Sequence, residues 1–191
     1  MVVTNSVSQK LTLAEFLELP ETKPASEYVD GKVDQKPMPQ GEHSILQTRL
    51  TRAINAVGEP QQLALALTEL RCTFSERSIV PDIAVFEWSR IPVTNKGRIK
   101  NRIEIAPDWI IEILSPDQSA NKVMKKILFC LHQGAQLGWL IDPEDESVMI
   151  FRLNQMPEIK SEDDLLPVLD RLRDLEITAK QLFCWLSVVG S

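Results

Sequence analysis

The sequence predicts a mixed α/β fold, organised around a strand, a helix and a second strand near the middle of the chain. Residues 109–114 form a short apolar run with prolines close to both ends, which is typical of a buried strand. Ser119 can cap a helix that runs to about Gln133 and stops at Gly134. Residues 136–141 are apolar again and predict the second strand. Two strands joined by a helix predict a parallel pair in a central sheet.

The flanking segments predict the remaining elements. Apolar residues recur at helical spacing in residues 11–19 and 41–57, so a helix is expected in each. Residues 26–33 place an Asp-Gly pair between extended segments, which predicts a β-hairpin. The other expected elements are strands at 63–67, 69–74, 79–86 and 147–152, a basic loop at 89–104, edge strands and turns at 154–176, and a helix at 179–186 capped by Thr178.

Length and composition favour one domain with one core. The chain has 191 residues, of which 43% are hydrophobic, and this is enough for a single core. We expect residues 1–9 to form a flexible tail and residues 10–191 to form the domain, with its core at about 26–153. The net charge of −6 argues against a protein that coats nucleic acid nonspecifically. It does not exclude a nuclease, which needs clustered acids and only a local basic rim.

The cysteines and the chain start indicate a reducing compartment. Cys72, Cys130 and Cys184 are far apart and form no Cys/His cluster, so a structural zinc site is not expected. The first ten residues lack the charged and apolar regions of a secretory signal. No apolar run approaches the length of a membrane span. We therefore expect a cytoplasmic protein with no membrane partner.

Two acidic residues are the candidates for chemistry. Glu112 lies inside an apolar run, where an unpaired carboxylate costs several kcal/mol, so it requires a metal, a basic side chain or a proton. Asp82 follows Pro81 in a second apolar run. If the two strands are neighbours, the carboxylates converge, and such oxygen ligands suit Mg²⁺ or Mn²⁺. The residues alone leave open that Asp82 is a turn or cap residue and that Glu112 belongs to a buried ion pair.

The order of several short motifs resembles the restriction-endonuclease-like proteins of the PD-(D/E)XK nuclease superfamily across about residues 10–153. The matching positions are residues 27–31, His43, Pro81 and Asp82, residues 112–116, Lys126, Gly134 and residues 139–143. The resemblance implies a restriction-endonuclease-like mixed sheet flanked by helices, with an N-terminal helix and β-hairpin. It also implies that Asp82 and Glu112 bind the metal and act in catalysis.

The superfamily usually places a lysine two residues after the second acid, and here Leu114 occupies that position. The resemblance indicates that the catalytic lysine has moved to the following helix, where Lys126 matches it. Helical spacing alone does not choose between Lys125 and Lys126, because they border opposite sides of the apolar stripe. Lys122 is the poorer match by position.

Four further residues are weighed as auxiliary site residues. His43 matches a recurrent histidine of the superfamily, but a surface or packing histidine at a helix start fits the sequence better. Glu27 would supply an extra acid or simply finish the hairpin. Glu69 and Arg71, on the strand expected before Asp82, would serve as an auxiliary ligand and as a partner for the acids.

Two main hypotheses for function follow. The first is a Mg²⁺-dependent endonuclease that cleaves DNA with two carboxylates and a lysine, with the basic loop at residues 90–102 contacting backbone phosphates. Cleavage of both strands would suit a homodimer, although the sequence identifies no interface. The second is a catalytically inactive nuclease-like module that binds nucleic acid or protein. A metal hydrolase for another phosphoester is a third, weaker reading.

Overall fold

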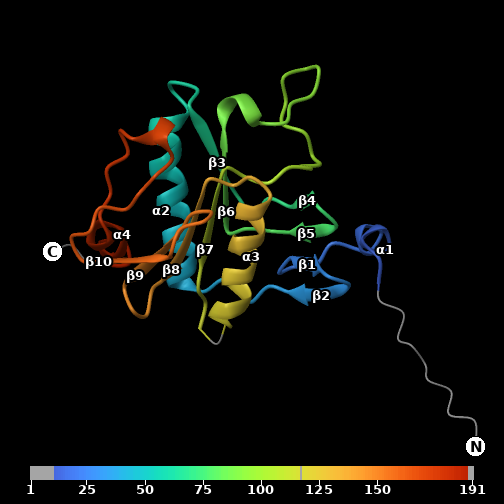
Figure 1. Ribbon diagram of the computed structural model, residues 1–191, viewed down its shortest axis with the longest axis horizontal. Helices are drawn as coiled ribbons and strands as arrows, with labels where there is room; N and C mark the ends of the chain where they lie inside the picture. The colour runs from blue at the N-terminus through green and yellow to red at the C-terminus, as the bar shows by residue number, and fades with distance from the viewer. Residues whose placement is uncertain (1–10, 117, 189–191) are drawn as a thin grey trace, which may run out of the picture.

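The computed structural model describes residues 11–116 and 118–188, which form two sheets and the helices around them (Figure 1). The expected tail at residues 1–9 lies outside the described residues. The larger sheet has the strand order β10-β9-β8-β7-β6-β3 and the smaller sheet the order β2-β1-β5-β4. The strands of the larger sheet are β3 (Ala64–Thr68), β6 (Ile83–Glu87), β7 (Trp109–Ile113), β8 (Leu137–Asp142), β9 (Ser147–Phe151) and β10 (Glu158–Ser161). Those of the smaller sheet are β1 (Ser26–Val29), β2 (Lys32–Gln35), β4 (Cys72–Phe74) and β5 (Arg77–Ile79).

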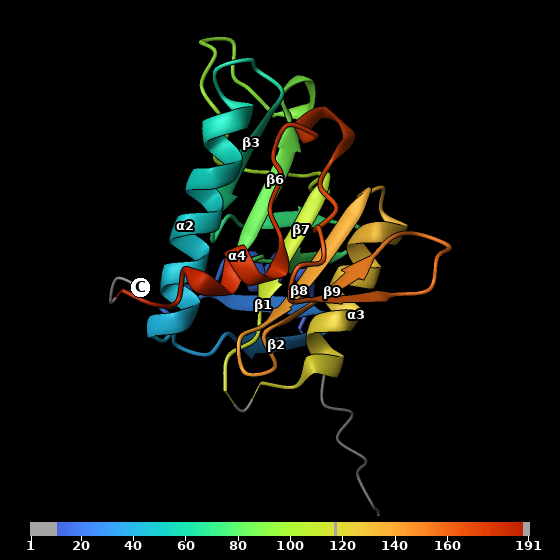
Figure 2. The same ribbon diagram turned by 90° about the vertical axis from the view of Figure 1, so that its left-hand side faces the viewer.

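Helices cover both faces of the larger sheet. The long helix α2 (Gly41–Gly58) lies on one face and α3 (Ala120–His132) on the other (Figure 2). The short helices α1 (Leu13–Leu17) and α4 (Ala179–Cys184) lie near the two ends of the chain. The predicted mixed sheet flanked by helices is therefore confirmed. No helix within the described residues has the length and apolar character needed to cross a membrane.

The central strand–helix–strand unit has the predicted topology. Strands β7 and β8 are parallel, with Trp109 opposite Leu137, and α3 connects them. The other pairs in the larger sheet are antiparallel. Gly134 follows α3 with a φ of 101°, a backbone conformation that glycine adopts without steric cost.

The predicted hairpin is also confirmed. Strands β1 and β2 pair with Val29 opposite Lys32. The two residues between them, Asp30 and Gly31, both have positive φ, at 52° and 82°, as the tightest hairpin turns require. The smaller sheet is completed by β5, which pairs with β1, and by β4.

Two predicted strands were wrong in their extent. Residues 79–86 do not form one strand, because β5 ends at Ile79 in the smaller sheet and β6 begins at Ile83 in the larger one. Pro81 lies in this crossing, and a proline has no N–H to donate to a sheet. Residues 69–74 are a strand only from Cys72, because Glu69 has a φ of 49° and turns the chain.

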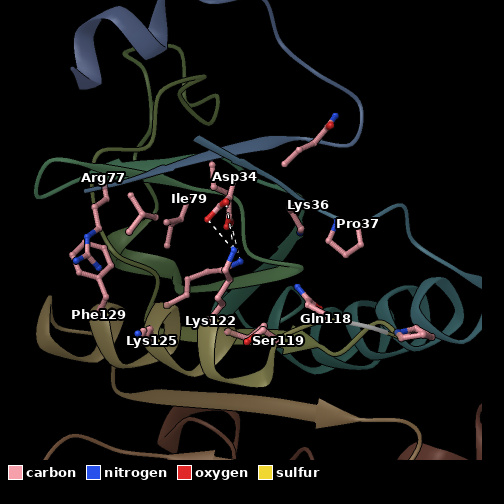
Figure 3. A pocket seen from close by; sticks show the side chains of 16 residues that line it. Asp34, Lys36, Pro37, Arg77, Ile79, Gln118, Ser119, Lys122, Lys125 and Phe129 are labelled. Carbon is pink, nitrogen blue, oxygen red and sulfur yellow. Dashed lines mark hydrogen bonds and ion pairs between the residues drawn. The ribbon is translucent and has the colours of Figure 1, made fainter. Parts of the chain in front are cut away.

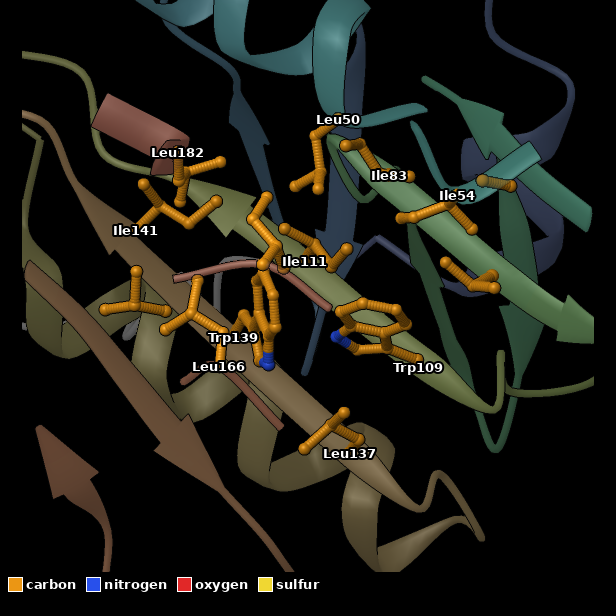
Figure 4. Packing of buried hydrophobic residues seen from close by; sticks show 14 of the residues in the cluster. Leu50, Ile54, Ile83, Trp109, Ile111, Leu137, Trp139, Ile141, Leu166 and Leu182 are labelled. Atoms are coloured by element: carbon orange, nitrogen blue, oxygen red, sulfur yellow. The ribbon is translucent and has the colours of Figure 1, made fainter. Parts of the chain in front are cut away.

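A layer of apolar side chains packs α2 and α4 against one face of the larger sheet (Figure 4). At its centre the rings of Trp109 and Trp139 meet edge to face, with centroids 4.7 Å apart. Leu50 and Ile54 of α2 pack beside them. A second core lies on the α3 side of the sheet. Along each strand, successive side chains point alternately into the first core and the second. Most of β7 is thus buried on both faces.

Gly138 in β8 permits the close approach of α3. A Cβ atom built at this position would lie 2.3 Å from Cγ2 of Ile127, and a β-branched side chain has little freedom to move aside. We expect Gly138→Ala to lower the free energy of unfolding by about 1–3 kcal/mol through overpacking. Urea denaturation followed by circular dichroism measures this change.

Gly41 provides the matched control, because a Cβ atom at this helical position meets nothing within 4 Å. We expect Gly41→Ala to change the free energy of unfolding by less than about 0.5 kcal/mol. Equal destabilisation by the two substitutions would contradict the packing argument.

Candidate active site

Asp82 and Glu112 face each other across neighbouring strands. In the antiparallel register of β6 and β7, Ile83 pairs with Ile111, so Asp82, one residue before β6, lies opposite Glu112. Directly opposed side chains in such a pair lie about 5 Å apart at Cβ. The two residues are 2% and 1% exposed. Oδ2 of Asp82 accepts a hydrogen bond of 2.7 Å from the backbone N–H of Ile113, which fixes the aspartate against β7.

Lys126 of α3 is the lysine that meets the second acid. Its Nζ donates to Oε2 of Glu112 at 3.0 Å and to Oε1 of Glu27 at 2.8 Å. Glu27, on β1, also accepts from the backbone N–H of Val80 at 2.7 Å. Lys125 is exposed, so Lys126 is the one of these two lysines that contacts Glu112. Glu27 belongs to the centre of the acid cluster and does more than finish the hairpin.

Lys36 is a cluster residue that the sequence reading missed. Its Nζ donates to Oδ1 of Asp82 at 2.6 Å, to Oε1 of Glu69 at 3.0 Å and to the carbonyl oxygen of Val80 at 2.9 Å. The residue directly follows β2 and precedes Pro37. A lone lysine in a proline-rich connection carries no pattern that marks it, so nothing in the sequence singles it out.

Helix α2 adds two side chains to the same place. His43 is 5% exposed, and its Nε2 lies 3.4 Å from Oδ1 of Asp82. Its Nδ1 lies 3.3 Å from the Ser115 hydroxyl. His43 is therefore not a surface histidine, and of the two alternatives to a catalytic role only a packing histidine remains. Gln47, one turn further on, donates to Oε1 of Glu69 at 3.2 Å and to the Asp82 carbonyl oxygen at 2.8 Å.

Arg71 lies away from the two central acids and takes other partners. It donates to Oε2 of Glu21 at 2.8 Å and to the Ser26 carbonyl and the Ser78 hydroxyl at 3.0 Å each. Its guanidinium also lies 5.4 Å from the ring centroid of Phe16. The expectation that Arg71 pairs with the acids is wrong, because the chain turns at Glu69, the strand begins only at Cys72, and Arg71 lies against the N-terminal segment.

The environment drives the pKa values of the two central acids apart. Burial raises the pKa of Asp82, but the neighbouring imidazole of His43 and the charge of Lys36 outweigh it, so the net shift is downward. Burial raises the pKa of Glu112 to about 8, against the opposing charge of Lys126 and with support from the charge of Asp82. A buried carboxyl group next to an ionised one is expected to behave in this way.

The two lysines remain charged despite burial. Burial lowers their pKa values, but the surrounding carboxylates more than compensate, so both values are raised. Asp82 contributes most to the rise at Lys36 and Glu112 to the rise at Lys126. The cluster is therefore held together by two ammonium groups, one for each central acid.

Two buried atoms indicate room for a cation. Oε1 of Glu112 and Nε2 of His43 accept or donate no hydrogen bond within the described part of the chain, and orphaned buried polar atoms are rare in native proteins. In addition, ligand atoms of His43, Glu69 and Asp82 all lie within 4.8 Å of one another. The carboxylate oxygens of this group fit Mg²⁺ or Mn²⁺.

A cavity of about 520 Å³ adjoins the acid cluster (Figure 3). Glu27, Lys36 and Lys126 reach it from the cluster side. Three more basic residues line it: Lys122, which lies 3.5 Å from Asp34, and also Lys125 and Arg77. The space beside the acids is thus bordered by positive charge, as a phosphate-containing ligand would require.

An aspartate and a glutamate are thus opposed on adjacent strands, with a lysine from the following helix beside them. This fold and arrangement are those of the restriction-endonuclease-like proteins. Residues 13–180 match the Uma2 family, described as "Putative restriction endonuclease", and the chain belongs to this family. It is also similar to a solved structure from Anabaena variabilis ATCC 29413, titled a putative nuclease belonging to DUF820, with 55% identity and a TM-score of 0.91. That match covers 93% of this chain and 99% of the other. No protein with a curated description matches.

The raised pKa of Glu112 predicts a pH-dependent stability in the presence of EDTA. Between its ordinary value of 4.5 and about 8, the folded protein holds a proton that the unfolded chain has released. The free energy of unfolding should therefore fall as pH rises through this window, by up to about 1.4 kcal/mol per pH unit. The lowered pKa of Asp82 affects stability only at lower pH, and the raised pKa values of Lys36 and Lys126 affect it only at higher pH. We expect Glu112→Gln to flatten the curve.

Urea denaturation at several pH values from about 5 to about 8 measures this slope. The control is Glu158→Gln, which removes an exposed acid of β10 and should leave the slope of the wild type unchanged. Parallel curves for Glu112→Gln and the wild type would show that Glu112 is ionised throughout this range.

Proposed function

We propose that this protein is a metal-dependent endonuclease that hydrolyses DNA phosphodiester bonds with two carboxylates and a lysine. The observation that carries the proposal is the pairing of Asp82 and Glu112 across β6 and β7, with Lys126 at 3.0 Å from Glu112 and one Glu112 oxygen left without a partner. Membership of a family described as restriction endonucleases supports the same reaction class.

Asp82 and Glu112 are the residues proposed to hold Mg²⁺ or Mn²⁺, with Glu69 and His43 as further donors. A divalent ion bound there would polarise a phosphate oxygen and lower the pKa of a bound water. The free oxygen of Glu112 suits this role because it has no hydrogen-bond partner to lose. Asp82 suits it because its lowered pKa keeps the carboxylate ionised, while Oδ2 keeps its hydrogen bond from the backbone N–H of Ile113.

Lys126 is proposed to act on the phosphate and the attacking water. Two carboxylates hold its ammonium group at 2.8 Å and 3.0 Å, so its position is fixed before substrate arrives. A fixed positive charge at this place stabilises the negative charge that develops on the phosphate during hydrolysis. Because its pKa is raised, Lys126 stays protonated. It supplies positive charge and does not act as a general base.

The basic residues that line the cavity beside the site are proposed to contact the DNA backbone. Lys122, Lys125 and Arg77 line this cavity together with Lys126, and such residues bind phosphates without reading sequence. In the basic loop at residues 90–102, Arg90 is already paired with the buried Asp108, while Lys96, Arg98, Lys100 and Arg102 are exposed and would add contacts further from the site.

Cleavage assays test the proposal. We expect the wild type to cut supercoiled plasmid or single-stranded DNA in Mg²⁺ or Mn²⁺ and to be inactive in EDTA. Asp82→Asn and Glu112→Gln should each lower the rate by more than about 100-fold, since each removes a negative charge that the reaction needs. Gel electrophoresis of plasmid, single-stranded DNA and RNA measures the rates and defines the substrate.

Glu158→Gln is the matched control, because it removes an acid from β10, at the edge of the same sheet. It should retain the wild-type rate. Cleavage that survives both Asp82→Asn and Glu112→Gln would remove these acids from the mechanism. Folded wild-type protein that cuts none of the three substrates would favour the alternative of an inactive binding module.

A further inference from the structure

Oxygen atoms surround the ammonium group of Lys36 as they would surround a bound metal cation. Four oxygens surround its Nζ: Oδ1 of Asp82 at 2.6 Å, the Val80 carbonyl oxygen at 2.9 Å, and Oε1 and Oε2 of Glu69 at 3.0 and 3.2 Å. The side chain is only 8% exposed. An ammonium group has three hydrogens to donate, and here each finds an acceptor. Lys36 is thus the counter-ion of Asp82 in the described structure.

The same oxygens are the ones that a divalent ion would need. Asp82 and Glu69 belong to the group whose ligand atoms lie within 4.8 Å of one another, together with His43. Mg²⁺ binds oxygen at about 2.0–2.1 Å. Two cations in direct contact with one carboxylate oxygen repel strongly in a buried place, where solvent screens little. Lys36 and a metal ion therefore compete for Asp82.

We propose that Lys36 is an internal cation that fills the metal-free site and is displaced into the adjoining cavity when a divalent ion binds. The inference rests on the metal site put forward above and adds a conformational step to it. Lys36 itself lines the cavity of about 520 Å³, so its ammonium group has space to enter without unfolding of the surrounding segments.

Lys126 behaves differently, and the contrast supports the assignment. It contacts Glu27 and Oε2 of Glu112, while Oε1 of Glu112 has no partner. A metal ion can therefore use Glu112 without removing Lys126. Oδ1 of Asp82 has no such freedom, because Lys36 donates to it at 2.6 Å and Oδ2 is held by Ile113.

The displaced ammonium group would gain a second role. In the cavity it would join the ammonium groups of Lys122, Lys125 and Lys126 and the guanidinium group of Arg77, and this positive charge would attract a phosphate. Metal binding and phosphate binding would then be linked, because each favours the outward position of Lys36. The metal-free protein, with Lys36 turned inward, would present one positive charge fewer to a nucleic acid.

Two measurements with Mn²⁺ test the proposal. The first is amine acetylation of the wild type with and without Mn²⁺, with the modified lysines quantified by mass spectrometry. Labelling of Lys36 should rise several-fold with Mn²⁺, while labelling of the buried Lys126 should stay low. This measurement uses the unaltered chain, so it does not depend on the folding of a variant.

The second measurement is Mn²⁺ titration calorimetry of the wild type, Lys36→Met and Lys122→Met. Lys36→Met should bind Mn²⁺ at least about tenfold more tightly, because the competing cation is gone. Lys122 is 70% exposed and lies 3.5 Å from Asp34, so Lys122→Met controls for the loss of a nearby positive charge and should change the affinity less than about threefold.

The outcomes separate this inference from the proposed function. Wild type that binds Mn²⁺ while Lys36 stays unlabelled, or Lys36→Met that binds no more tightly than the wild type, overturns the displacement and leaves the metal site standing. Absence of Mn²⁺ binding from both proteins overturns the displacement together with the metal site. Raised labelling together with tighter binding by Lys36→Met supports the displacement.

Discussion

The burial of negative charge between β6 and β7 is the constraint on which the rest of the structure depends. Asp82 and Glu112 are almost fully buried and directly opposed, and two such carboxylates are unfavourable without compensation. Lys36 and Lys126 supply that compensation. With Glu27 and Glu69 included, four acidic groups surround two ammonium groups, and the proposed metal ion would balance the excess of acid.

The path of the chain explains how the acids come together. Residues 80–82 pass from the smaller sheet to the larger one, so Asp82 stands where the two sheets meet. Glu27 of β1 and Lys36, which directly follows β2, reach the same point from the hairpin. The larger sheet contributes Glu112. The site is therefore a product of the junction between the sheets, and neither sheet contains it alone.

Much of this arrangement could be predicted from the sequence, and the exceptions have physical causes. A carboxylate in an apolar run marks Glu112, and hydrophobic periodicity gives the parallel pair and both long helices. A continuous apolar run does not reveal that its strand changes sheets, so the break at Pro81 was missed. Lys36 was missed because its partners are distant in sequence, and a surface-type residue in a loop becomes buried only through tertiary contacts. The positive φ of Glu69 likewise depends on the fold around it.

The buried ion pairs join residues that are far apart in the sequence, and this has an evolutionary consequence. Glu27 faces Lys126 across a separation of 99 positions, and Lys36 faces Glu69 across 33. A charge reversal at one member of either pair places like charges in contact. Reversal of both members does not restore the cluster, because Lys126 also contacts Glu112 and Lys36 also contacts Asp82. These positions should accordingly stay fixed together in homologous sequences, and a chimaera whose hairpin comes from a relative that lacks them should fold poorly.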